Sequence, residues 1–120
     1  MEKASNTTDL LAAALQAEAL RQRAIASNIA NIETPGYRRV DVKFEELLAK
    51  AMDEGGGKVD VQKAEPEVYE PRNTPVKANG NDVNLELEIG QMVKNTLRHD
   101  TLARLLIKKV NGIDKIIDVP

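Results

Sequence analysis

The sequence predicts a mainly α-helical chain: long N- and C-terminal helices pair as a coiled-coil-like hairpin, around a short, mobile middle region that is irregular or β-containing. Two observations predict this fold class. Apolar residues recur at alternating steps of four and three near both ends of the chain, which is the heptad pattern of packed helices. The apolar content comes mostly from alanine, leucine, isoleucine and valine, with one phenylalanine and no tryptophan. That composition favours helix–helix packing over a compact core with aromatic anchors.

The first part of the chain is expected to be a tail followed by two helices. Residues 1–7 are polar and expected to be disordered, and residues 8–52 are expected to form a helix, a turn and a short helix. Thr7 or Thr8 can cap the first helix. The short helix should begin near Phe44 and show one apolar face. The heptad positions of the first helix are Leu11, Leu15, Glu18, Gln22, Ile25, Ile29 and Ile32.

The turn after the first helix centres on Thr34-Pro35-Gly36-Tyr37. Pro35 disfavours the helical conformation of Thr34 and cannot donate a backbone hydrogen bond. Pro35 and Gly36 suit the two central positions of a type II turn, in which the glycine supplies a positive φ. The sequence therefore predicts a sharp reversal here.

Polar side chains occupy the last two turns of the otherwise apolar first helix: Ser27, Asn28 and Asn31. They fit two interpretations. One is an ordinary helix stop with solvated amides. The other is an amide-lined corner that pairs with another element.

Residues 53–81 are expected to be a flexible middle segment. It opens with three consecutive glycines, residues 55–57, and contains Pro66, Pro71 and Pro75. Residues 58–62 and 67–69 could form short strands, but the apolar content is too small to hold them without a partner.

Residues 82–120 are expected to form the longest element, a helix capped by Asn81 or Asp82. In an antiparallel pairing with the first helix, Glu18 and Gln22 lie level with Thr96 and His99. The far end of this helix then overhangs and needs another partner, so we expect marginal stability of the isolated chain. The heptad positions are Leu85, Ile89, Met92, Thr96, His99, Ala103, Leu106, Val110, Ile113 and Ile117.

The composition argues against catalysis, cofactor or metal binding. The formal charge is −2, so no global field favours nucleic acid or anionic lipid. The chain has no cysteine and a single histidine, His99, which excludes disulfides, thiol chemistry and a two-histidine metal site. No nucleophile–base pair can be nominated. We therefore expect no enzyme activity, no cofactor, no small-molecule substrate and no nucleic-acid partner. The N-terminus lacks a signal-peptide pattern.

The corner and its surroundings resemble the bacterial flagellar rod and hook axial protein family. The match rests on residues 25–37, Ile25-Ala-Ser-Asn-Ile-Ala-Asn-Ile-Glu-Thr-Pro-Gly-Tyr37, followed by Val40-Asp-Val-Lys-Phe44. Residues 83–117 match more loosely, and His99-Asp100 stands where the family tends to have an aromatic residue and a glutamine. The short chain resembles the proximal rod members, because the distal rod and hook members carry a much larger middle domain.

The resemblance implies a structural subunit of the flagellar basal-body proximal rod, part of the drive shaft that crosses the periplasm. Such proteins are exported by the flagellar type III apparatus without signal cleavage, and they assemble helically through their terminal helices. The implied partners are other copies, other rod proteins, the protein at the junction of membrane ring and rod, and the export apparatus. By this match the corner residues are Asn28, Asn31, Thr34, Pro35, Gly36 and Tyr37. The helix-packing candidates, chosen with the heptad pattern, are Ile25, Ile29, Leu85, Ile89, Met92, Leu106 and Val110.

The alternative is a soluble helical adaptor or regulatory protein, which binds a partner helix through its exposed seam. Such a protein needs no export and works in the cytoplasm.

Overall fold

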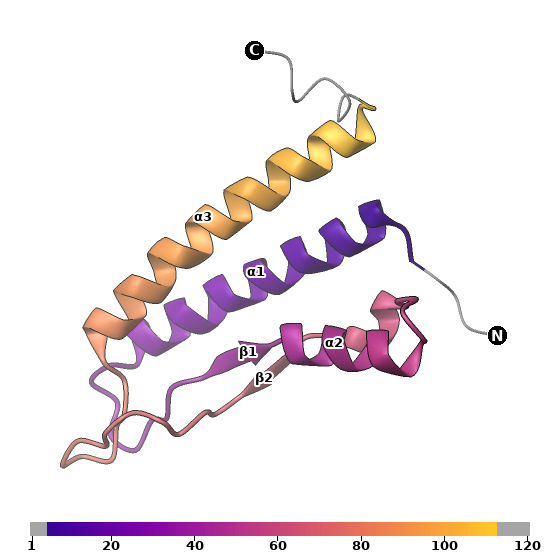
Figure 1. The fold of residues 1–120 in the computed structure, drawn as a ribbon. Coiled ribbons are helices and arrows are strands. Elements are labelled where there is room, and N and C mark those ends of the chain that lie inside the picture. Colours follow the sequence, from indigo (N-terminus) through magenta and orange to yellow (C-terminus); the bar gives the residue numbers. More distant parts are fainter. Residues whose placement is uncertain (1–4, 113–120) are drawn as a thin grey trace.

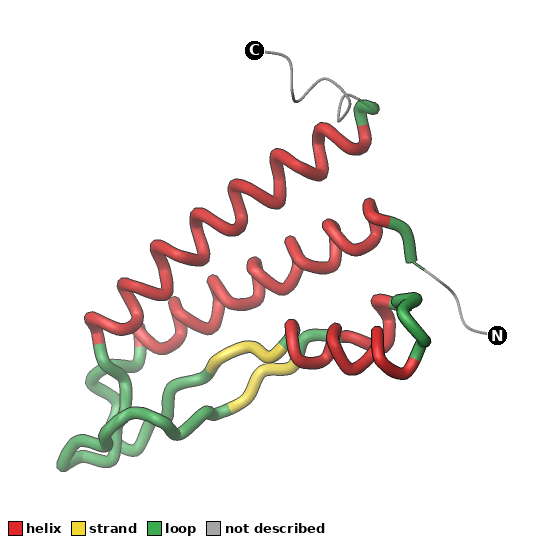
Figure 2. The backbone as a smooth tube through the Cα atoms, in the orientation of Figure 1, coloured by secondary structure: helices red, strands yellow, loops and turns green. Residues whose placement is uncertain are grey.

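The structure, a computed structural model, describes residues 5–112. Three α-helices dominate it, and the two strands form one small antiparallel sheet (Figures 1 and 2). The mainly α-helical fold class is therefore confirmed. The elements in chain order are α1 (Thr7–Ala30), β1 (Asp41–Lys43), α2 (Glu45–Glu54), the 3₁₀ helix η1 (Val61–Ala64), β2 (Glu67–Tyr69) and α3 (Leu85–Val110).

Helix α1 begins one residue earlier than expected because Asn6 caps it, not a threonine. The Asn6 side chain accepts a hydrogen bond from the backbone N–H of Asp9 (2.8 Å), and the Asp9 carboxylate accepts one from the backbone N–H of Asn6 (3.1 Å). This reciprocal arrangement is a capping box. The helix ends at Ala30, with Asn31 as its C-terminal cap.

Helices α1 and α3 lie side by side and run in opposite directions (Figure 1). Their axial register agrees with the expected one: Gln22, Thr96 and His99 line one groove, and the Asn95 side chain donates to the Glu18 carbonyl oxygen (2.6 Å). A coiled-coil geometry for the pair stays a prediction. The two helices separate toward the C-terminal end of α3 (Figure 1).

The rotation of α3 about its axis differs from the expected one. Glu88 and Asn95 are its buried residues, whereas the expected seam residues Leu85, Ile89 and Val110 are 46%, 48% and 67% exposed. The expectation that Leu85 and Ile89 bury themselves against α1 is therefore wrong for the single chain. Polar contacts to α1 fix the helix in this orientation, as shown below. The expected heptad positions Ile113 and Ile117 lie outside the described residues.

A thin apolar core lies on the other side of α1, against α2 and η1. Its buried members come from α1, α2, η1 and the residue that precedes α2, and half-buried leucines of α2 pack around them. The alanines of α1 allow this close approach because their side chains are small. The cluster consists of Ala17, Phe44, Ala51 and Ala64, with Ala13, Ala14, Leu47 and Leu48 packed against it.

The middle segment contains more defined structure than the sequence indicates. Strand β2 pairs antiparallel with β1, with Val42 opposite Val68, so the expected strand at 67–69 is confirmed. The expected strand at 58–62 is wrong, since η1 begins at Val61 and the Asp60 side chain caps it. Val59 and Ala64 are buried. The mobility of this segment in solution stays a prediction. Among residues 5–112, no helix is both long and apolar enough to span a membrane.

Candidate functional site

The predicted turn is present at the end of α1. Gly36 has a φ of 75°, as the third residue of a type II turn requires. The backbone N–H of Tyr37 donates to the Thr34 carbonyl oxygen (3.2 Å), which closes the turn. The Gly36 N–H donates to the carbonyl oxygen of Asn79 (2.9 Å), and so ties this turn to a second loop far along the chain.

Asn28 is the centre of the corner. Its side chain is fully buried and makes four hydrogen bonds. The Nδ2 group donates to the Val40 carbonyl oxygen (2.9 Å) and to Oε1 of Glu88 (2.8 Å). The Oδ1 atom accepts from the Tyr37 hydroxyl (3.1 Å) and from the Val40 N–H (2.8 Å). Both atoms of the side-chain amide are thus hydrogen-bonded within the chain. The interpretation as a solvated helix stop is therefore wrong for Asn28.

The neighbouring polar residues stabilise the turn locally. The Asn31 side chain donates to the Ser27 carbonyl oxygen (2.8 Å) and accepts from the Thr34 hydroxyl (3.1 Å). The Ser27 and Tyr37 hydroxyls lie 3.0 Å apart. Of the six corner residues, Thr34, Pro35 and Gly36 lie on the exposed outside of the turn.

The loop before α3 supplies two corner residues that sequence analysis took for helix caps. Buried Asn81 donates from Nδ2 to the carbonyl oxygens of Asn31 and Thr34, each at 2.9 Å. Buried Asp82 accepts from the backbone N–H of Arg39 (2.6 Å). The cap of α3 is instead Asn84, whose side chain accepts from the Leu87 N–H (3.1 Å). The only local signal for Asn81 and Asp82 was a polar run that also fits a turn.

A buried ion pair completes the corner. Arg39 is 3% exposed and Glu88 fully buried, and Nε of Arg39 donates to Oε2 of Glu88 (2.7 Å). Burial disfavours the guanidinium charge, but the hydrogen bond and the charge of Glu88 outweigh burial and raise the pKa of Arg39. Glu88 therefore accepts from both Asn28 and Arg39, which joins α3 to α1 and to the chain after the turn. Sequence analysis missed both members of this pair.

A second polar cluster joins α1, α2 and α3 near the middle of the hairpin. Arg21 donates to Oε2 of Glu18 (2.6 Å) and to the carboxylate of Glu45. Burial opposes the charge of Glu45, yet the hydrogen bond and charge of Arg21 outweigh it and lower the Glu45 pKa. Oε1 of Glu18 has no hydrogen-bond partner among the described residues, and a guanidinium nitrogen of Arg98 lies 3.8 Å from it.

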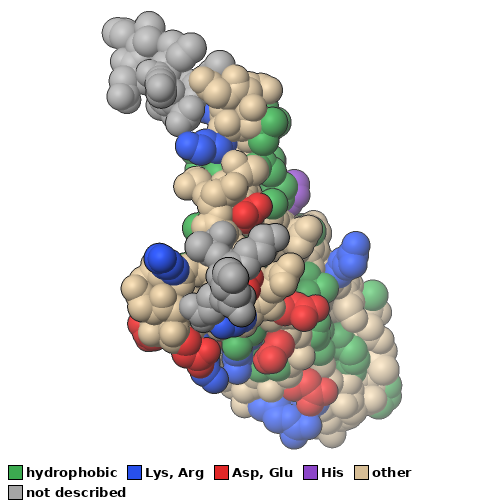
Figure 3. Space-filling model, turned by 90° about the vertical axis from the view of Figure 1, so that its right-hand side faces the viewer, with side chains coloured by type: hydrophobic (Ala, Val, Ile, Leu, Met, Phe, Trp, Pro, Cys, Tyr) green, Lys and Arg blue, Asp and Glu red, His purple; other side chains and the backbone are tan. Residues whose placement is uncertain are grey.

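The helix-packing candidates divide between the interior and the surface. Ile25 is buried, and Ile29, Met92 and Leu106 are half-buried. The exposed candidates belong to a larger apolar surface on α3, and hydrophobic side chains lie at the surface where α3 projects from the body of the molecule (Figure 3). The exposed large apolar residues of α3 are Leu85, Ile89, Val93, Leu97, Leu105, Ile107 and Val110.

The described residues offer structural contacts and no reaction centre. Within residues 5–112, no group of three His, Cys, Asp or Glu side chains is placed to hold a metal ion. Both polar clusters form hydrogen bonds between elements, and Oε1 of Glu18 is left without a partner. The arrangement can fix the relative position of helices and present an apolar helix face.

Comparisons with known proteins show which family the chain resembles. A family model described as flagella basal body rod protein matches residues 10–38, which span most of α1 and the turn. The chain is 32% identical over 114 residues to the flagellar basal body rod protein FlgB of Cereibacter sphaeroides, covering 85% of this chain and 86% of that protein.

Two further relatives of the same name come from distant bacteria. FlgB of Aeromonas hydrophila is 27% identical over 114 residues, covering 87% of this chain and 86% of that protein. FlgB of Bacillus subtilis is 26% identical over 121 residues, covering 94% of each. The chain belongs to the FlgB family of flagellar basal body rod proteins, a family of structural components and not of enzymes.

Proposed function

We propose that this chain is a subunit of the proximal rod, the part of the drive shaft that crosses the periplasm. In this proposal the flagellar type III apparatus exports the chain without signal cleavage. The chain then assembles helically through its terminal helices, which pair as a coiled-coil-like hairpin. Its partners are other copies, other rod proteins, the protein at the junction of membrane ring and rod, and the export apparatus.

The observation that carries this proposal is the exposed apolar face of α3. Leu85, Ile89, Val93 and Leu97 follow one another at four-residue spacing, and their exposed fractions are 46%, 48%, 55% and 62%. Residues four apart share one side of a helix. A contiguous apolar surface of this kind marks an interaction site. In an assembled rod, neighbouring subunits cover it.

The corner residues have a separate role in this proposal. Asn28, Asn31 and the turn at 34–37 hold the N-terminal helix against the start of α3, so that each subunit presents its two long helices as one unit. The helix-packing residues Leu85, Ile89 and Val110 then contact other subunits instead of α1. A shaft that transmits torque needs such fixed helices and no catalytic groups.

The test uses the source bacterium. The gene is deleted and restored as a tagged copy, and swimming is scored together with the tag in purified basal bodies. We expect deletion to abolish swimming and the restored tag to be recovered with the rod. Normal swimming after deletion, or a tag that stays in the cytoplasm, would instead favour a soluble helical adaptor.

A matched pair of variants separates assembly from folding. Ile89→Ser changes the apolar face of α3 and should reduce the tag in basal bodies, although the purified variant keeps its helicity. Val68→Ser makes a comparable change at an exposed residue of β2 (53% exposed) and should leave swimming intact. Equal effects of both variants would contradict a specific role of the α3 face.

A further inference from the structure

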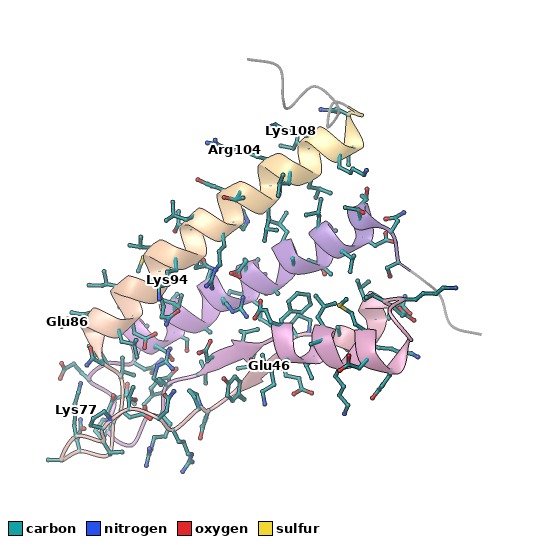
Figure 4. The ribbon with its side chains drawn as sticks, viewed as in Figure 1. Glu46, Lys77, Glu86, Lys94, Arg104 and Lys108 are labelled. Carbon is teal, nitrogen blue, oxygen red and sulfur yellow. The ribbon has the colours of Figure 1, made fainter. Side chains whose placement is uncertain are left out.

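The chain contains two Asn-Gly pairs, Asn79-Gly80 and Asn111-Gly112. Asparagine is thermolabile because the backbone nitrogen of the next residue can attack its side-chain carbonyl carbon. A glycine in that next position has no Cβ to obstruct the approach. The pairs follow Lys77, which lies before the start of α3, and Lys108, which lies in its last turn (Figure 4). The structure holds the two pairs very differently.

The first pair is fixed by hydrogen bonds in the loop before α3. The Gly80 N–H, whose nitrogen would have to attack, donates to the Lys77 carbonyl oxygen (2.9 Å). Oδ1 of Asn79 accepts from the Asn81 N–H (3.1 Å), and the Asn79 carbonyl oxygen accepts from the Gly36 N–H (2.9 Å). A Cβ added to Gly80 would lie 3.2 Å from Cα of Gly36, so this loop packs closely against the turn. An attack on Asn79 therefore requires that the loop open.

The second pair lies at the end of α3 and is held by fewer contacts. Asn111 is the exposed C-terminal cap of the helix, and its side chain forms no hydrogen bond with any residue from 5 to 112. The Gly112 N–H donates to the Lys109 carbonyl oxygen at 3.2 Å. No atom lies within 4 Å of a Cβ added to Gly112. The Gly112 nitrogen and the side-chain carbonyl carbon of Asn111 therefore approach each other without opening any other part of the fold.

We propose that Asn111 is a site of spontaneous deamidation, and that the folded structure protects Asn79 from the same reaction. The Gly112 backbone nitrogen loses its proton to solvent and forms a bond to Cγ of Asn111, and the side-chain nitrogen leaves as ammonia. A water molecule then hydrolyses one of the two C–N bonds of the resulting cyclic imide. The product is aspartate, or isoaspartate, in which the backbone runs through the side-chain carbonyl carbon.

The product changes the end of α3. A carboxylate replaces a neutral amide beside the C-terminal carbonyl groups of the helix, where the helix dipole disfavours negative charge. The isoaspartate form also lengthens the backbone directly after the helix. Val110, the last residue of α3, is 67% exposed and contacts other subunits in the proposed function. Under that proposal deamidation alters a contact surface, but the reaction itself does not depend on assembly.

Peptide mapping of the purified full-length chain tests the proposal. The folded chain is incubated at mildly alkaline pH, which favours loss of the proton from the attacking nitrogen. Trypsin then releases residues 78–94 and 110–115 as separate peptides. Mass spectrometry with fragmentation scores the replacement of each amide by a carboxylate, and a protein isoaspartate methyltransferase labels the isoaspartate form. We expect Asn79 to react about tenfold more slowly than Asn111, or slower still, a factor that corresponds to about 1.4 kcal/mol of additional hydrogen bonding.

Two controls show whether the structure selects the site. In urea, Asn79 and Asn111 should react at similar rates, because the hydrogen bonds around Asn79 are then lost. Gly112→Ala should slow the reaction at Asn111, because it places a methyl group beside the attacking nitrogen. The added Cβ meets no atom within 4 Å, so the rest of the fold should be kept, and circular dichroism establishes that it is.

Three results would overturn the inference: equal rates at the two asparagines in the folded chain, a faster reaction at Asn79, or no reaction at Asn111. Each of them leaves the basal-body test of the proposed function unaffected, because that test scores incorporation of the tagged chain.

Discussion

Asn28 of α1 donates a hydrogen bond of 2.8 Å to Glu88 of α3, and both side chains are fully buried. The two residues lie 60 positions apart in the chain. The contact between the two long helices is therefore polar at the end where the chain turns, and most of the large apolar side chains of α3 are left at the surface.

The first prediction concerns this contact. Asn28→Ala removes four hydrogen bonds: it leaves the Val40 backbone N–H and carbonyl without these partners, and it leaves Oε1 of Glu88 with only the longer bond from Arg39 (3.4 Å). Because unsatisfied buried polar groups cost about 1–3 kcal/mol each, we expect a loss of about 3 kcal/mol in the free energy of unfolding. Urea unfolding followed by circular dichroism measures it. Asn73→Ala, at an exposed position, should change the unfolding free energy by less than about 0.5 kcal/mol.

The second prediction concerns the buried ion pair. Glu88→Gln keeps the shape of the side chain but removes the charge closest to Arg39, so a guanidinium that is 3% exposed keeps only the longer ion pair with Asp41 (3.8 Å). Breaking a buried pair from one side costs about 3–5 kcal/mol. A double-mutant cycle with Arg39→Met should show that the two changes are not additive, because the second removes the charge that the first deprives of its closest partner. Additive effects would mean that the pair is not coupled.

The third prediction compares two glycines. Gly36 has a φ of 75° and no atom within 4 Å of an added Cβ, so Gly36→Ala is penalised only by backbone strain of about 1–2 kcal/mol. Gly36→Val should cost more and misdirect the turn, because β-branched residues resist positive φ strongly. Gly90 also has open space around its Cβ but lies inside α3, and there Gly90→Ala should stabilise by about 1 kcal/mol. Thermal melting of the three variants shows whether each substitution raises or lowers the stability of the folded chain.

The fourth prediction concerns pH. The pKa of Glu45 is lowered in the folded chain because the hydrogen bond and charge of Arg21 outweigh the opposing effect of burial. The ionised carboxylate therefore adds stability above the usual pKa of a glutamate, and this contribution is lost as the pH falls through the lowered folded-state pKa. Since the Glu45 side chain is 64% exposed, the contribution should not exceed about 1 kcal/mol.

Urea unfolding between neutral and acidic pH measures this contribution as the difference between wild type and Glu45→Gln. The difference should be positive at neutral pH and vanish in acid. Glu46→Gln is the control, because this exposed neighbour forms no ion pair among the described residues. A difference that stays constant with pH would show that the ionised form of Glu45 is not the source of the stability.

The sequence predicted those features that depend on neighbouring residues. Pro35 and Gly36 specify the turn through their own preferred φ angles. The heptad spacing of apolar residues predicted both long helices. The rotation of α3 was not predictable in this way, because heptad analysis places apolar residues inside, whereas Glu88 and Asn95 are the buried ones. Their burial depends on partners in α1 and, for Glu88, on Arg39 after the turn, which supply the hydrogen bonds.

The roles of Asn81 and Asp82 were missed for a related reason. A polar residue just before a helix is usually a cap, and that local rule favoured them over Asn84. Their true partners, Asn31 and Arg39, lie 50 and 43 positions away, so no local pattern contains the contact. Besides the local polar run, the sequence offered one distant indication, the unusual polar residues at the end of α1.

Two polar contacts tie α3 to α1: the Asn28–Glu88 hydrogen bond and the hydrogen bond from Asn95 to the Glu18 carbonyl oxygen. Beyond Asn95, the rest of α3 as far as Val110 is about 22 Å long. A rotation of about 10° at Asn95 would displace the end of α3 by about 4 Å. The position of the exposed apolar side chains at that end therefore depends on how rigidly the two polar contacts hold the helix.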